Sequence, residues 1–283
     1  MRVKLIVSPY DSGRRDWRQG RGPLHVAGAV AARLARDGNE VDAETVEASE
    51  PHFESRTAFE LCRGIAARAR AARAAGFFPL VLSGNCSASV GLLAGLETPR
   101  RGVVWLDAHG DFNTPEISPS GYLDGMSLAV AAGRCWTTIA GGIDGHTPLG
   151  DDRIVLIGAR DVDPGERDAL LTARLAWLSV ADVRAGKLAP ALGALAERAD
   201  GIVLHVDMDV HDPERTQANS YPAPGGLYPD EVRAIARQTA TKVPVLGATL
   251  AAFDPGYDAS GETAAAVVEL AGEIVAAVSK SNR

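Results

Sequence analysis

Short apolar runs alternate with longer segments of helical periodicity along the 283 residues. The apolar runs predict strands at residues 3–7, 40–46, 77–82, 103–106, 154–157, 175–178, 202–206 and 245–250. The periodic segments predict helices at residues 23–36, 55–75, 88–96, 125–132, 190–198, 229–239 and 262–278. Strands that alternate with helices form βαβ units. The pattern therefore predicts an α/β fold in which helices cover both faces of a mostly parallel sheet of about eight strands. Because no linker or repeat interrupts the pattern, residues 1–283 are expected to form a single domain.

Two of the predicted strands end in acidic residues at alternating positions. The strand at 103–106 is followed by Asp107, His109 and Asp111, and the strand at 202–206 by Asp207 and Asp209. If the first strand continues in extended form, its three polar side chains point to one side. Carboxylates and an imidazole that converge in this way suit a divalent cation. An Asp-rich turn that caps the next helix would explain one such segment equally well, but two of them favour a metal centre. In a parallel sheet, the loops after Leu82, Leu106, Ile157, Val206 and Leu250 are expected at one edge.

Composition narrows the class of partner. The net charge of -7 argues against nucleic acid or an anionic membrane as the main partner. The three cysteines include no CxxC pair, which favours a reducing compartment over a disulfide framework. The first residues lack the apolar core of a signal peptide, and no apolar run approaches membrane-spanning length. We expect a soluble cytoplasmic protein with a small-molecule substrate.

The two acidic segments carry a family resemblance. Asp-Ala-His-Gly-Asp at 107–111, with Asp-Met-Asp-Val-His-Asp-Pro at 207–213, resembles the arginase/agmatinase (ureohydrolase) family. The likeness extends to Gly-Arg-Gly-Pro at 20–23, the turn at 83–87 and Pro-Ala-Pro-Gly-Gly-Leu at 222–227. It implies a three-layer α/β/α arginase-like fold and a homo-oligomer, either a trimer or a hexamer. It also implies two manganese ions per subunit, bridged by a hydroxide that hydrolyses a guanidino group.

The resemblance assigns the metal ligands. Asp107 and Asp207 would bridge the two ions, Asp111 would belong to the first site, and His109 and Asp209 would belong to the second. At the position of the sixth ligand, a histidine in the family, this chain has Cys86. Cys86 is therefore either a soft ligand that weakens the first site or a small inert residue beside it, with its thiol within reach of metal or substrate in both cases.

The resemblance also assigns the substrate-binding loops. Asn113, Ser118 and Ser120 match positions that hold a substrate α-carboxylate, and Asp163 and Glu166 match positions that hold an α-amino group. The chemistry is compatible, because neutral donors suit a carboxylate and carboxylates suit an ammonium group. On the residues alone, the acidic pair could instead be the N-terminal cap of a helix. With the resemblance, an α-amino acid substrate is favoured.

Two further positions depart from the family. Asp124 stands where arginases have a histidine that shuttles protons, so it is either a catalytic acid or base with a raised pKa or the cap of the next helix. Asp111 or Asp124 would then pass a proton to the leaving amine, and His205 or His211 could also take this role. Ala252 stands where a glutamate pairs with the cationic guanidinium, and Asp254 aligns with a neighbouring asparagine.

These departures argue against ordinary arginine, because a closed site without the glutamate would leave the guanidinium charge unpaired. They fit an N-hydroxyguanidine, which is less basic and offers a hydroxyl oxygen to the metal. The hypothesis is a hydroxyarginase-type hydrolase that converts Nω-hydroxy-L-arginine to L-ornithine and hydroxyurea, as in antibiotic biosynthesis. The alternatives are hydrolysis of arginine, agmatine, guanidinobutyrate or formiminoglutamate, or a non-catalytic member that binds an amino acid or metal.

Overall fold

A single parallel sheet spans most of the chain in this computed structural model, which describes residues 1–50, 53–96 and 98–281. All of its strand pairs are parallel. In spatial order its eight strands are β4 (Glu40–Thr45), β1 (Arg2–Ser8), β5 (Phe78–Ser83), β10 (Val245–Ala251), β9 (Gly201–Asp207), β6 (Arg101–Leu106), β7 (Ile154–Ile157) and β8 (Ala176–Leu178). The predicted α/β class and strand number are confirmed.

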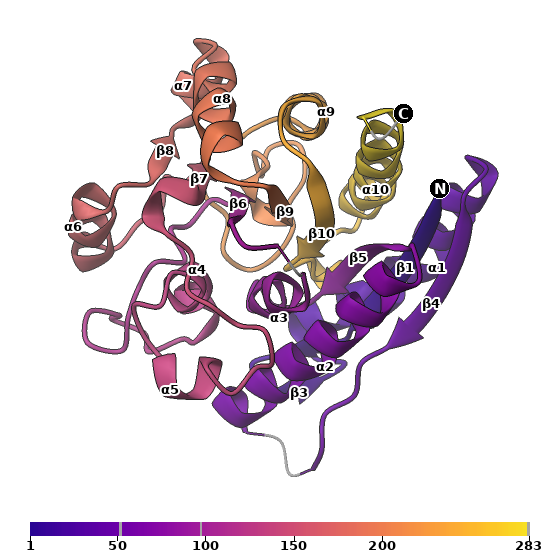
Figure 1. Ribbon diagram of the computed structural model, residues 1–283, viewed down its shortest axis with the longest axis horizontal. Coiled ribbons are helices and arrows are strands. Elements are labelled where there is room, and N and C mark those ends of the chain that lie inside the picture. Colours follow the sequence, from indigo (N-terminus) through magenta and orange to yellow (C-terminus); the bar gives the residue numbers. More distant parts are fainter. Residues whose placement is uncertain (51–52, 97, 282–283) are drawn as a thin grey trace.

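Helices cover both faces of this sheet, as Figure 1 shows. One layer contains α1 (Arg21–Arg36), α8 (Leu188–Arg198), α9 (Pro229–Lys242) and α10 (Glu262–Ser281). The opposite layer contains α2 (Glu54–Ala74), α3 (Ala88–Gly95) and α4 (Ser127–Ala131). The predicted three-layer α/β/α arrangement is therefore confirmed. None of the described helices combines the length and the apolar composition that crossing a membrane requires.

The strand sequences explain why two helical layers form. Successive side chains of a strand point to opposite faces, so an all-apolar strand supplies both layers at once. In β1, Leu5 packs into the cluster with α1 and α10, whereas its neighbour Ile6 packs into the cluster with α2 and α3. The polar strand β4 pairs only with β1 and lies at the edge of the sheet, as its composition predicts.

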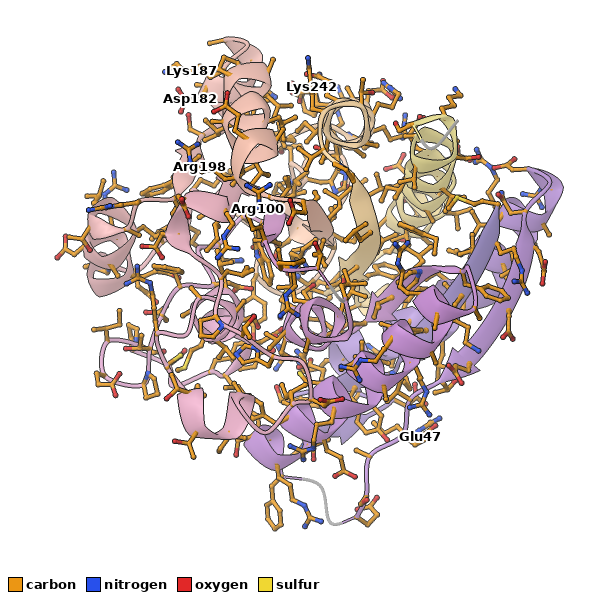
Figure 2. The ribbon with its side chains drawn as sticks, in the orientation of Figure 1. Glu47, Arg100, Asp182, Lys187, Arg198 and Lys242 are labelled. Atoms are coloured by element: carbon orange, nitrogen blue, oxygen red, sulfur yellow. The ribbon has the colours of Figure 1, made fainter. Side chains whose placement is uncertain are left out.

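Several short elements were missing from the sequence prediction. They are the hairpin strands β2 (Tyr10–Asp11) and β3 (Arg14–Arg15) and the helices α5 (Thr137–Ala140), α6 (Pro164–Thr172) and α7 (Val180–Arg184). These three helices bury only one or two side chains each, so they have no apolar repeat for a periodicity analysis to detect. Lys187 lies between α7 and α8 and places its Nζ atom 2.6 Å from Asp182 Oδ1, at the top of Figure 2. Surface ion pairs of this kind contribute little to the free energy of unfolding.

The strand register brings the functional loops together. Because the sheet is parallel, all of its strands end at the same edge. Leu106 of β6 is level with Val206 of β9, and Ala251 of β10 is level with Asp207. Asp107 therefore follows β6 beside the end of β9, and Ala252 follows β10 beside Asp207. The prediction that these loops share one edge is confirmed.

Candidate active site

A cavity of about 290 Å³ opens at the carboxyl edge of the sheet. Eleven of the twelve residues predicted for the site line it, and the twelfth, Asp107, is buried below with 1% of its surface exposed. The eleven are Cys86, His109, Asp111, Asn113, Ser118, Ser120, Asp124, Asp163, Glu166, Asp207 and Asp209. Loops that are far apart in the sequence therefore meet at one cavity.

One group of ligand atoms surrounds His109. Its Nδ1 atom lies 3.4 Å from Asp107 Oδ1 and 3.3 Å from Asp209 Oδ2. The ligand atoms of these three residues all lie within 4.8 Å of one another. This is the set that the resemblance assigns to the second metal site, with Asp107 shared between sites.

A second group surrounds Cys86. Its thiol donates to Asp207 Oδ2 over 2.9 Å, and its sulfur lies within 4.8 Å of ligand atoms of Asp107 and His205. Asp107 thus belongs to both groups, which is the placement that a bridging ligand requires. The position of the thiol against Asp207 also agrees with the expectation that it lies within reach of a metal.

Asp111 reaches the cavity by an unexpected backbone path. The predicted extended continuation of the strand is wrong: β6 ends at Leu106, and Asp111 has a left-handed backbone with φ of 49°. Aspartate tolerates this conformation better than most residues do. Its Oδ2 atom is buried and has no hydrogen-bond partner among the described residues. A buried carboxylate oxygen without a donor fits a site that a cation completes.

His109 is the one basic side chain among the predicted metal ligands, so four carboxylates there share a single positive charge. Burial, followed by the charge of Asp209, raises the pKa of Asp107 to about 6 and the pKa of Asp207 well above its ordinary range. Burial and the charge of Asp107 likewise raise the pKa of Asp111. Burial opposes ionisation of Asp209 too, but His109 outweighs it and lowers the pKa of Asp209. The oxygen-rich set with one imidazole suits manganese, and Cys86 is its one soft donor.

Asp124 holds the turn that carries Cys86. Its Oδ2 atom accepts from Asn85 Nδ2 at 2.8 Å and from the Cys86 backbone N–H at 3.0 Å. Its Oδ1 atom accepts from the Ser87 N–H at 3.0 Å and from the Ser127 hydroxyl at 3.1 Å. Burial raises the pKa of Asp124 to about 6. The side chain fastens the 85–87 turn rather than simply capping the helix that follows it, a role that we did not predict.

One part of the cavity wall is built by α6 and the loop after β6, which carry the residues that the resemblance assigns to the amino-acid head group. Glu166 Oε1 accepts from the Phe112 N–H at 2.7 Å, and burial raises the pKa of Glu166 to about 7. Asp163 Oδ2 accepts from Asn113 Nδ2 at 3.0 Å. Asp163 is also the N-terminal cap of α6, as the capping alternative expects, and it lines the cavity as well.

At the position where the resemblance expects a glutamate, the cavity wall has only the methyl group of Ala252. Ala252 lines the cavity, is 2% exposed and has a left-handed backbone with φ of 63°. Asp254 does not line the cavity, because its carboxylate accepts from Arg21 over 2.6 Å and from the Gly256 N–H over 2.9 Å.

The two histidines next to the second acidic segment do not line the cavity. His205 stacks on Trp105 with ring centroids 3.7 Å apart, and its Nδ1 lies 2.9 Å from the Ser89 hydroxyl. Burial lowers the pKa of His205 to about 3 and that of His211 to about 4, so both rings are neutral. Neither is placed to replace the family's proton-shuttling histidine at the substrate.

The sequence analysis missed Gln19, Tyr122, Asp161 and Tyr221, which also line the cavity. Each lies within three residues of a segment that the analysis did single out. Gln19, Tyr122 and Tyr221 have no side chain that marks a metal ligand, whereas the carboxylate of Asp161 could have been noticed. Tyr122 donates to the buried Asp11 over 3.0 Å, and Tyr221 lies with its ring centroid 6.3 Å from those of both Tyr122 and His109.

Comparisons with known proteins agree with this geometry. The arginase family profile matches residues 2–277. An arginase of Bacillus caldovelox is 34% identical over 206 residues, which are 70% of this chain and 69% of that protein. The N(omega)-hydroxy-L-arginine amidinohydrolase of Streptomyces lavendulae is 33% identical over 159 residues, 55% of this chain and 54% of that protein. The crystal structure of an arginase from Bacillus cereus superposes with a TM-score of 0.88 at 28% identity, covering 97% of this chain and 98% of that chain.

Family members are manganese-dependent hydrolases of guanidino compounds, and the two acidic strand ends found here are where such a centre would be held. Because the profile match extends over nearly all of the chain and the fold agrees, this protein belongs to the arginase family.

Proposed function

We propose that this protein hydrolyses Nω-hydroxy-L-arginine to L-ornithine and hydroxyurea. The observation that carries the proposal is the cavity wall at Ala252, where no carboxylate of residues 252–254 faces the substrate space. A guanidinium is fully cationic at neutral pH and would find no carboxylate to pair with at this wall, because the proposal uses the other acidic residues of the cavity as metal ligands, as ligands of the amino group or, for Asp124, to hold the 85–87 turn. An N-hydroxyguanidine is less basic and can enter as a neutral group.

The other end of the cavity supports an α-amino acid. Asp163 and Glu166 supply carboxylates for an ammonium group, and Asn113, Ser118 and Ser120 supply polar groups for a carboxylate. The relative from Streptomyces lavendulae carries the proposed activity in its name. Relatives named arginase match equally well, so the substrate choice depends on the cavity rather than on overall similarity.

The proposed roles of the residues follow from their positions. Asp107 and Asp207 would bridge two manganese ions, with Asp111 and Cys86 on one side and His109 and Asp209 on the other. When bound, the metal ions lower the pKa of a coordinated water so that hydroxide forms near neutral pH. Asp111, whose buried carboxylate lines the cavity, is placed to hold a proton for the departing amine, and Asp124 keeps Cys86 in position. The trimer or hexamer that the resemblance implies stays a prediction.

The test is a side-by-side assay of manganese-loaded protein on Nω-hydroxy-L-arginine, L-arginine and agmatine. We expect kcat/KM for the hydroxylated substrate to be at least about 100-fold higher than for arginine, because an unpaired buried charge costs about 3 kcal/mol or more. Preference for arginine would refute the substrate proposal. Absence of turnover on all three by a metal-loaded protein would favour the non-catalytic alternative.

An Asp163→Ala variant tests the amino-acid end separately. Guanidinobutyrate lacks the α-amino group that Asp163 would hold, so its turnover, where wild-type protein shows any, should stay nearly unchanged. The KM for Nω-hydroxy-L-arginine should rise about tenfold, since a hydrogen-bonded charge pair contributes about 1.5 kcal/mol. Equal decreases in kcat/KM for all substrates would instead show that Asp163 is needed for the folding of α6.

A further inference from the structure

Gln19 is a buried polar side chain in the wall of the substrate cavity. It belongs to the short 3₁₀ helix η1 (Arg18–Gly20), is only 4% exposed and lines the cavity together with Ala252 and Cys86. Its Oε1 atom is buried and has no hydrogen-bond partner among the described residues. Buried amide oxygens are nearly always bonded, so this one is available to a group that enters the cavity.

The backbone around Gln19 leaves it little freedom to turn away. A Cβ atom at Gly84 would lie 2.7 Å from the Cα of Gly20, so these two segments pack backbone against backbone. A Cβ atom at Gly22 would lie 1.9 Å from the carbonyl oxygen of Phe253. The backbone that directly follows Gln19 is thus packed against the turn that leads to Cys86 and against the residue that follows Ala252.

The neighbour of Gln19 is fixed as well. Arg18 has a left-handed backbone with φ of 47°, and its guanidinium donates to the Tyr221 hydroxyl over 2.5 Å. Its Nε atom lies 3.4 Å from Asp11 Oδ2, a carboxylate that is fully buried. These contacts hold η1 at the cavity wall, which prepares the Gln19 side chain for a ligand before that ligand binds.

We propose that Gln19 is a specificity-determining residue that binds the guanidino end of the substrate in place of the absent carboxylate. This inference rests on the proposed function and deepens it. An amide is neutral and carries both an acceptor and two donors. It can accept from an N–H of the substrate and donate to the hydroxyl oxygen of an N-hydroxyguanidine. It offers no negative charge to a guanidinium, so it favours the less basic substrate.

Three variants test the proposal. Gln19→Met keeps the length of the side chain without its amide, Gln19→Glu restores a carboxylate at the cavity wall, and Gln238→Met makes the same change at an exposed glutamine of α9. We expect Gln19→Met to raise the KM for Nω-hydroxy-L-arginine about tenfold, the effect of roughly one lost hydrogen bond. Gln19→Glu should shift the ratio of kcat/KM values towards L-arginine by at least about tenfold, and Gln238→Met should match wild type.

Thermal unfolding separates this role from a structural one. Because Gln19 Oε1 has no partner among the described residues, replacing the amide by an apolar group of similar length should not destabilise the fold, and the melting temperature of Gln19→Met should equal or exceed that of wild type. A lower melting temperature with an unchanged KM would identify Gln19 as a packing residue and overturn the inference. If wild-type protein prefers the hydroxylated substrate while Gln19→Met keeps its KM, the inference alone fails. If wild-type protein does not hydrolyse that substrate, the proposed function fails with it.

Discussion

Replacing Asp124 by asparagine separates its observed structural role from the proton-transfer role that its alignment suggests. At pH 8, above its pKa of about 6, Asp124 is ionised and accepts four hydrogen bonds, two on each oxygen. Three of the donors belong to Asn85, Cys86 and Ser87. An asparagine keeps one acceptor oxygen and turns the other into an NH2 group, which would face at least one fixed N–H donor of the 85–87 turn.

The expected loss follows from these contacts. Two hydrogen bonds to a charged acceptor contribute about 1.5 kcal/mol each, and the opposed donors add a further penalty, so the free energy of unfolding should fall by about 3–5 kcal/mol. For a chain of this size that corresponds to a decrease of roughly 10 °C in melting temperature. Because the 85–87 turn carries Cys86, kcat should fall as well.

The measurement is denaturant unfolding of metal-free protein at pH 8, followed by kcat of the manganese-loaded protein. Asp168→Asn, an exposed position on α6, serves as the matched control and should unfold like wild type. If Asp124 acts only in proton transfer, kcat falls while the free energy of unfolding changes by less than about 1 kcal/mol. That result would refute the role of Asp124 in holding the turn.

Three further changes test other parts of the site. Asp107→Asn should abolish hydrolysis and lower the manganese stoichiometry while the circular dichroism spectrum stays native; an active, metal-loaded variant would contradict the bridging role. Burial raises the pKa of Glu166 from 4.5 to about 7, so its contribution to folding is complete below pH 4.5 and is lost as the pH rises through 7. Metal-free Glu166→Gln should therefore be about 3 kcal/mol more stable relative to wild type at pH 8 than at pH 4.5, and equal unfolding curves at both pH values would count against this. Asn219→Leu removes the amide donor that lies 3.1 Å from Asp209 Oδ2, and it should weaken manganese binding about tenfold in a titration. An unchanged affinity for manganese would show that Asn219 does not support the ligand Asp209.

The metal-ligand candidates could be found from the sequence because their signal is local. Each acidic segment directly follows an apolar strand, and parallel strands bring such ends to one edge regardless of what lies between them. The register that aligns Leu106 with Val206 then places Asp107 beside Asp207. The extended path expected as far as Asp111 was wrong, because the chain turns after Leu106 and no apolar partner strand continues beside it.

The roles of Asp124 and Gln19 could not be predicted in the same way. Asp124 is 37 to 39 residues from the donors of the 85–87 turn, and no local pattern records that contact. Gln19 resembles any polar loop residue until the backbone packing of Gly20 against Gly84 places it at the cavity. Both roles depend on contacts between loops that are distant in the sequence. The conformations of such loops are only weakly specified by local sequence patterns.

The backbone at Ala252 bears on whether the site still catalyses a reaction. Ala252 donates its N–H to the Ser83 carbonyl over 3.1 Å, and its own carbonyl accepts from Asn219 over 3.1 Å. The same Asn219 amide also donates to Asp209, so the strand end remains tied to the metal-ligand cluster. A left-handed non-glycine residue is retained only where its surroundings fix it. The strand end at Ala252, where the resemblance expects a glutamate, is thus held in place together with the metal-ligand cluster, and this order supports the proposed change of substrate over the non-catalytic alternative.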